Sequence, residues 1–61
     1  MRFAVGDSVW YDNSKGRVMS EAESLNLAFT TIVRVEVDWD NGARTIVWES
    51  DLMTDAEHAE G

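Results

Sequence analysis

The sequence has 61 residues with a mass of 6.9 kDa, and it contains neither cysteine nor proline. Such a chain is expected to form one small domain, held by packing or self-association because it has no disulfide and no thiolate metal site. Hydrophobic residues make up 44% of the chain, which is more than a disordered segment contains. No apolar stretch is long enough for a membrane span or a signal peptide, so we expect a cytoplasmic protein without membrane contact.

The net charge of −7 is concentrated at the C-terminal end. From Glu49 onward the chain carries five acidic residues and no lysine or arginine, whereas seven acidic and five basic residues precede that point. An acidic protein repels phosphates, so direct binding to nucleic acid is disfavoured. Residues 54–61, which lack large apolar side chains, are predicted to form an acidic, disordered tail.

Short strands and turns alternate along the first part of the chain. A turn at residues 5–8 leads into a predicted strand at residues 9–11, and a run of turn-forming residues at 12–16 precedes a second strand that begins at residue 17. Residues 20–29 allow two interpretations. Ser20 and Glu23 have the spacing of a helical capping box, but an extended strand is favoured because an isolated helix of this length is marginal.

The strongest pattern lies in residues 33–48. Apolar and charged residues alternate up to Trp39, Asn41-Gly42 indicates a tight hairpin turn, and a second β-branched run follows. A two-residue loop would pair Val37 with Ile46 and Val35 with Trp48, which places all four on one face and Trp48 in the core. The same register sets Trp39 opposite Arg44 as a stacked pair. A tight turn at 50–53, with Leu52 packed inward, is expected to follow.

These elements predict an all-β fold in which a small, strongly curved antiparallel sheet of four to five strands closes into a barrel. The barrel is expected to span residues 1–53, with the tail at 54–61 outside it.

Several short signatures resemble the SH3-like small barrels, with Tudor and KOW-type modules as the nearest members. The stretches that carry the resemblance are Val5-Gly6-Asp7-Ser8-Val9, Lys15-Gly16-Arg17-Val18, the segment from Val35 to Gly42, and Asp51-Leu52. The resemblance implies an SH3-like barrel with a short 3-10 turn near the C-terminus, and a role as a binding module. Tudor modules hold methylated lysine or arginine in an aromatic cage, but only Tyr11, Trp39 and Phe29 fall near cage positions here. KOW-type modules usually contact RNA or ribosomal and polymerase partners through a basic face, which this chain lacks.

The chain offers little for catalysis or metal binding. His58 is the only histidine and lies in the predicted tail, without a rigidly placed nucleophile. Asp38, Asp40 and Glu49 have the spacing of positions 1, 3 and 12 of a calcium loop, but glycine and alanine occupy positions 5 and 6, where an oxygen ligand and a glycine are required. We therefore expect no enzyme activity, no cofactor and no metal site.

The aromatic residues are the main functional candidates. If Val9 and Tyr11 point inward, Trp10 points outward and could anchor a partner; in the opposite phase Trp10 belongs to the core. We interpret the chain as a non-catalytic protein-interaction module, accessory or regulatory and of phage type, whose acidic rim favours a basic segment of an unidentified protein partner. The predicted contact residues are Trp10, Tyr11, Asp12, Asp38, Trp39, Asp40 and Arg44.

Two other functions are compatible with the sequence. An acidic mimic of nucleic acid would inhibit a DNA- or RNA-binding protein through the residues from Glu49 to Glu60. A structural subunit would instead associate with copies of itself, for example as a homodimer through an exposed strand edge.

Overall fold

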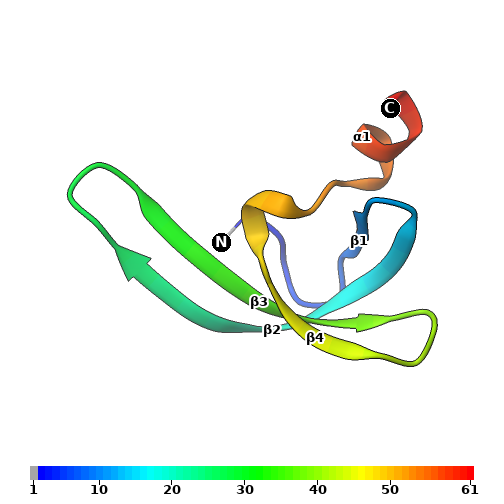
Figure 1. Ribbon diagram of the computed structural model, residues 1–61, viewed down its shortest axis with the longest axis horizontal. Helices are drawn as coiled ribbons and strands as arrows, with labels where there is room; N and C mark the ends of the chain where they lie inside the picture. Colours follow the sequence, from blue (N-terminus) through cyan, green and yellow to red (C-terminus); the bar gives the residue numbers. More distant parts are fainter. Residues whose placement is uncertain (1) are drawn as a thin grey trace.

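The computed structural model describes residues 2–61, so the first residue of the predicted 1–53 domain lies outside the described part. The protein is mostly β, as predicted, with four antiparallel strands in one sheet ordered β1-β2-β3-β4 (Figure 1). A short 3-10 turn and a short helix follow the sheet. The elements are β1 (Ser8–Tyr11), β2 (Ser14–Asn26), β3 (Thr31–Trp39), β4 (Arg44–Trp48), η1 (Glu49–Asp51) and α1 (Asp55–Glu60).

The predicted closure into a barrel is wrong: across residues 2–61 the four strands form one open sheet. After β4 the chain turns through η1 and returns to β1, where Trp10 and Met53 form a single isolated bridge. Each of these two residues donates its backbone N–H to the other's carbonyl oxygen at 2.9 Å. Closure would require a ladder between β1 and the last strand. β4 has only five residues and ends opposite Arg34, before the chain reaches β1, so the single bridge leaves the sheet open.

The ambiguous region 20–29 is mainly extended, which confirms the strand interpretation up to Asn26. β2 is 13 residues long, and its register against β3 shifts between Val18 and Ser20 and again between Glu21 and Glu23. Each shift marks one extra residue in β2, a β-bulge, and bulges bend and twist a strand. As a result, residues 24–33 project beyond the end of β4 as a two-stranded extension, seen at the left of Figure 1. We call residues 24–33 the arm.

The register predicted for the β3–β4 hairpin is wrong by one residue. Val35 pairs with Val47 and Val37 with Thr45, because the loop contains three residues instead of two. The Trp39 N–H donates to the Ala43 carbonyl at 2.8 Å, and the Gly42 N–H donates to the Trp39 carbonyl at 2.9 Å. Gly42 has φ +91°, the left-handed conformation that three-residue hairpin loops place at this position.

The longer loop reverses the faces of β4. Ile46 and Trp48, which were expected inside, retain 54% and 46% of their surface exposed. Val47 packs against the core instead. Thr45 faces the same way, and its hydroxyl accepts a 2.8 Å hydrogen bond from the Trp39 indole N–H. Thr45 of β4 therefore satisfies the partly buried indole N–H of Trp39, which an apolar residue at position 45 could not do.

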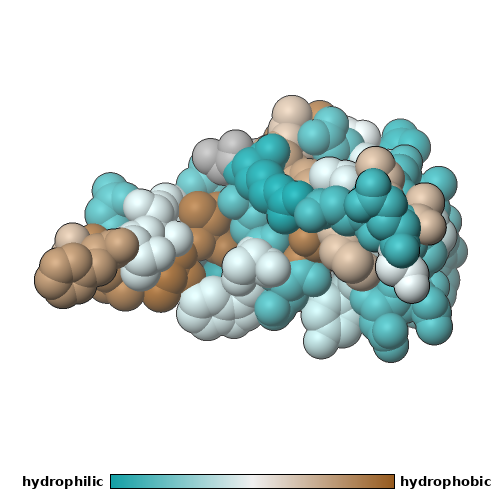
Figure 2. Space-filling view, turned by 90° about the horizontal axis from the view of Figure 1, so that it is seen from above, coloured by the Kyte–Doolittle hydropathy of each residue, from teal (hydrophilic) through white to brown (hydrophobic). Residues whose placement is uncertain are grey.

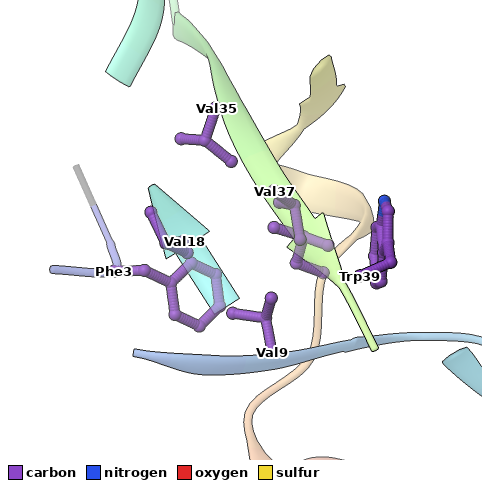
Figure 3. Close-up of a cluster of buried hydrophobic side chains, with 7 residues drawn as sticks. Phe3, Val9, Val18, Val35, Val37 and Trp39 are labelled. Carbon is purple, nitrogen blue, oxygen red and sulfur yellow. The ribbon is translucent and has the colours of Figure 1, made fainter. Parts of the chain in front are cut away.

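One cluster of buried apolar side chains forms the core, and side chains from the N-terminal segment, β1, β2 and β3 lie together in it (Figure 3). Trp39 forms one end of this core and packs so closely on β2 that a Cβ atom at Gly16 would lie 2.7 Å from its ring. Leu52 packs inward after η1, as predicted. The buried members are Phe3, Val9, Val18, Val35, Val37, Trp39 and Leu52.

Candidate functional site

Trp10 points away from the core, as the outward phase predicted, since its neighbour Val9 is fully buried. The Trp10 side chain is nevertheless half-buried, because α1 covers it. The His58 ring stacks on Trp10 with ring centroids 3.7 Å apart and an interplanar angle of 9°. The Trp10 indole N–H also donates to the Asp55 carboxylate at 2.7 Å.

Residues 55–60 form the helix α1, in a segment that the sequence predicted to be a disordered tail. Thr54 and Glu57 form a capping box, in which the Thr54 hydroxyl accepts from the Glu57 N–H and the Glu57 carboxylate accepts from the Thr54 N–H. Arg2 forms an ion pair with Glu57. Capping and contacts with Trp10 and Arg2 supply the packing that such a short helix lacks by itself.

Two carboxyl groups of α1 have lowered pKa values. Hydrogen bonds from the Trp10 indole and the Ser8 hydroxyl hold the pKa of Asp55 below its ordinary value. For Glu57, the backbone N–H of Thr54 is the largest cause of the lowered pKa, and Arg2 adds to it. The ionised form of Asp55 is thus stabilised by groups of β1, and that of Glu57 mainly by the helix cap itself with a further contribution from Arg2.

We expect α1 to detach from Trp10 in acid. Because the folded-state pKa values of Asp55 and Glu57 are lowered, their contribution is present above the ordinary carboxyl pKa of about 4 and is lost as the pH falls through the folded values. NMR should show the Trp10 indole proton moving toward the position of a solvated indole below about pH 4. In Asp55→Asn the acid-induced movement should shrink, and an unchanged movement in this variant would contradict the assignment.

An open groove lies at the end of the sheet where the β1–β2 turn meets the β3–β4 loop. It consists of two adjoining hollows of about 360 and 420 Å³ that share Ser14, Trp39 and Asn41. Trp10 lines the first hollow and Tyr11 the second. We call this surface the aromatic groove; its other lining residues are Asn13, Lys15, Asp40, Ala43, Thr45 and Val47.

Backbone hydrogen bonds hold the walls of the aromatic groove together. The Asp40 N–H donates to the Lys15 carbonyl at 2.9 Å, which ties the β3–β4 loop to the start of β2. The β1–β2 connection has only two residues, and its first, Asp12, has φ +54°, a conformation that Asp tolerates better than most residues. The Lys15 ammonium lies 5.7 Å from the Trp10 ring centroid, within reach of a cation–π contact.

The structure gathers most of the predicted contact residues at this end of the protein. Trp10, Tyr11, Trp39 and Asp40 line the aromatic groove, and Asp12 lies in the turn between β1 and β2.

Asp38 and Arg44 lie elsewhere. They pair across β3 and β4 on the outer face of the sheet and do not line the groove, with a nitrogen-to-oxygen distance of 3.9 Å. The predicted stack of Trp39 on Arg44 is therefore wrong, because Trp39 turns into the core.

Sequence reasoning missed the apolar surface at the other end of the protein. The arm exposes Leu25, Leu27 and Phe29, and Phe29 is 100% accessible. The space-filling view shows this end as a hydrophobic protrusion at the left (Figure 2). A signal was present in the sequence: residues 24–33 are the longest stretch without a charged side chain.

Comparison with protein-family models, curated proteins and solved structures finds no match for this chain. Among residues 2–61, no group of three or more histidine and acidic side chains is arranged to hold a metal ion. Neither η1 nor α1 reaches the length and apolar character of a membrane-crossing helix in this part of the chain. The site is therefore interpreted from its own geometry.

Proposed function

We propose that this protein is a non-catalytic interaction module, acting as an accessory or regulatory subunit, that binds an extended segment of a larger protein in the aromatic groove. The observation that carries the proposal is the pair of adjoining hollows at this end of the sheet, which share Trp39 and contain Trp10 in one and Tyr11 in the other, with walls tied by backbone hydrogen bonds. Grooves lined by aromatic side chains suit extended peptides, because flat rings offer large contact area at low entropic cost.

The chemistry around the aromatic rings favours a polar peptide backbone as the ligand. The Asn13 and Asn41 side chains and the Ser14 hydroxyl line the groove beside the rings. Amides and hydroxyls can each donate to and accept from peptide groups. Tyr11, with 49% of its surface exposed, is the aromatic residue with the most area left for a ligand.

Charge favours a segment that carries lysine or arginine. The net charge of −7 attracts basic partners at long range, and Asp12 and Asp40 are exposed at this end of the protein. Lys15 is the basic residue that lines the groove, and its ammonium is directed at the Trp10 ring.

Kinship with SH3-like modules is part of the same proposal. The 3-10 turn at η1 and the bridge from Met53 to β1 lie where the resemblance implies a closing turn, and they support the proposal.

The nucleic-acid mimic is a weaker candidate. Three acidic residues from the C-terminal region make internal contacts: Glu49 accepts from the backbone of Arg2, Asp55 from Trp10, and Glu57 from Thr54. Carboxylates used in this way are less available to imitate a row of phosphates.

We expect Tyr11→Ala to weaken peptide binding at least about tenfold, or about 1.4 kcal/mol, because Tyr11 supplies the most accessible ring in the groove. The peptides would be selected from a random displayed library with the wild-type protein, and their affinities measured by fluorescence polarisation. Selected sequences should be enriched in lysine and arginine.

Ile46→Ala is the matched control for this experiment. Ile46 is exposed to a similar extent but lies on the opposite face of the sheet, so its removal should leave affinity unchanged. Equal losses in the two variants, or failure to select any peptide, would contradict the proposal.

A further inference from the structure

β4 forms an open edge of the sheet (Figure 1). It is the last strand in the sheet order, and within residues 2–61 it pairs with β3 alone. The pairing is regular from Arg44 to Trp48, without a bulge, and four of the five residues are exposed to solvent. A regular edge strand offers unpaired backbone groups with which another strand can pair. β4 is therefore a candidate for binding an extended chain.

The hydrogen-bond pattern of the β3–β4 hairpin identifies the free backbone groups. The Trp39 N–H donates to the Ala43 carbonyl at 2.8 Å, so these two residues form a hydrogen-bonded pair. Hydrogen-bonded and non-hydrogen-bonded pairs alternate along an antiparallel ladder, which directs the backbone groups of Thr45 and Val47 toward β3. The alternate residues of β4, beginning with Arg44, direct theirs away from β3. No backbone group of another segment in residues 2–61 donates to the Arg44 carbonyl or accepts from its N–H.

The second hollow of the aromatic groove lies beside this edge. Tyr11 lines it from β1, and Thr45 and Val47 line it from β4. Because β1 and β4 are the first and last strands of the sheet order, the hollow lies in the gap that the open sheet leaves between them. Thr45 is exposed even though its hydroxyl faces the core side and accepts from the Trp39 indole. The hollow has a volume of about 420 Å³, which is within the range of ligand sites.

The other free edges of the sheet are less suited to an added strand. The part of β2 that extends past β1 has two register shifts and carries Glu21 and Glu23. Bulges and charged side chains obstruct the pairing of a further strand. β1 is bridged to Met53 at Trp10, and β3 is free over only its first three residues. Among these edges, that of β4 is both regular and next to the groove.

We propose that the partner segment binds as an added β-strand along β4 and fills the gap between β4 and β1. This inference rests on the proposed function and specifies how the groove holds its ligand. Backbone hydrogen bonds to the β4 edge supply affinity for a strand of any sequence, and the hollow supplies specificity. Side chains alternate between the two faces of a strand, so every second side chain of the ligand enters the hollow between Tyr11 and Val47. The ligands should therefore combine lysine or arginine with apolar residues at alternate positions.

Charge favours a basic segment of another protein over a second copy of this chain. The edge of β4 accepts a strand of any sequence, so the charge of the incoming chain distinguishes the two occupants. Two chains of −7 repel each other at long range. A lysine- or arginine-bearing segment is attracted instead, and the exposed carboxylates of Asp12 and Asp40 lie at this end of the sheet.

A proline at the first position of β4 tests the backbone contact. Arg44→Pro removes the outward N–H, and proline is tolerated at the first residue of a strand and on an edge strand whose N–H faces solvent. Arg44→Ala is the matched reference, because it loses the same side chain and keeps the N–H. Arg44→Pro should bind the selected peptides at least about tenfold more weakly than Arg44→Ala. Equal affinities in the two folded variants, with folding checked by NMR dispersion, would overturn the proposal.

N-methylation of the ligand tests the same contact without changing the protein, and it decides the question if Arg44→Pro does not fold. Each peptide N–H of a selected ligand is methylated in turn, and the affinities for the wild-type chain are measured by fluorescence polarisation. An added strand directs every second N–H toward β4. Methylation at alternate positions should therefore weaken binding at least about tenfold, and the intervening positions should tolerate it. Sensitivity without this alternation would contradict an added strand.

Amide hydrogen exchange distinguishes the possible occupants. Exchange of the Arg44 and Trp48 amides should be fast in the free protein and slow when the peptide is bound. Protection that grows with protein concentration in the absence of peptide would identify a second copy as the occupant and overturn the proposal. If Tyr11→Ala weakens binding while Arg44→Pro matches Arg44→Ala, strand addition is wrong and the groove assignment stands. Failure to select any peptide would contradict both.

Discussion

Replacing Trp39 with alanine should lower the free energy of unfolding by about 3–5 kcal/mol, the usual cost of truncating a buried aromatic residue. The Trp39 ring lies in the core, covers Gly16, and donates its indole hydrogen bond to Thr45. A domain of this size is stabilised by only about 3–9 kcal/mol, so the variant should lose at least about a third of its stability. Urea denaturation followed by circular dichroism, and the loss of NMR chemical-shift dispersion, would measure the effect.

Trp48→Ala is the matched control, and it distinguishes the two registers of the β3–β4 hairpin. With the three-residue loop, Trp48 is 46% exposed on the outer face, and its removal should cost less than about 1 kcal/mol. With a two-residue loop, Trp48 would lie in the core and its truncation would be severe. A larger loss for Trp48→Ala than for Trp39→Ala would therefore contradict the observed register.

Gly16→Ala should destabilise the fold by about 1–3 kcal/mol, although alanine is normally accepted in a strand better than glycine. The added Cβ atom would lie 2.7 Å from both the Trp39 ring and the Val37 side chain, and 3.0 Å from the Asp38 carbonyl oxygen. These atoms belong to the core and to the neighbouring backbone, so neither can move without disturbing the sheet.

The double variant Gly16→Ala with Trp39→Leu separates overpacking from other effects, with Trp39→Leu as the single reference. A smaller side chain at position 39 leaves room for the methyl group, so Gly16→Ala should cost less in the Trp39→Leu background than in the wild type. Equal costs in both backgrounds, measured by urea denaturation, would show that the Trp39 ring is not what excludes a side chain from position 16.

The aromatic groove and the arm lie at opposite ends of a molecule with a longest dimension of 35 Å. The aromatic groove lies between the β1–β2 turn and the β3–β4 loop. The arm projects from the other end of the sheet, at the left of Figure 1.

Strand alternation limited the orientation of Trp10 to two phases, and the burial of Val9 in the structure selects the outward one. The same reasoning could not find the cover over Trp10, because α1 lies 45 residues away in sequence from the indole that it contacts. The helix depends on a capping box and on contacts with Trp10 and Arg2.

The sequence by itself determined the β-rich class, the approximate positions of the strands and the inward packing of Leu52, because each depends on local alternation and turn chemistry. It left the phase of Trp10 open, and the burial of Val9 in the folded sheet selected the outward one. Only the tertiary structure decided the β3–β4 register. Asn41-Gly42 fits loops of two or three residues, and the Trp39 indole favours Thr45 as its core-side neighbour. The open sheet and the projecting arm were also decided there, since the bulges that bend β2 and the early end of β4 depend on which strands meet.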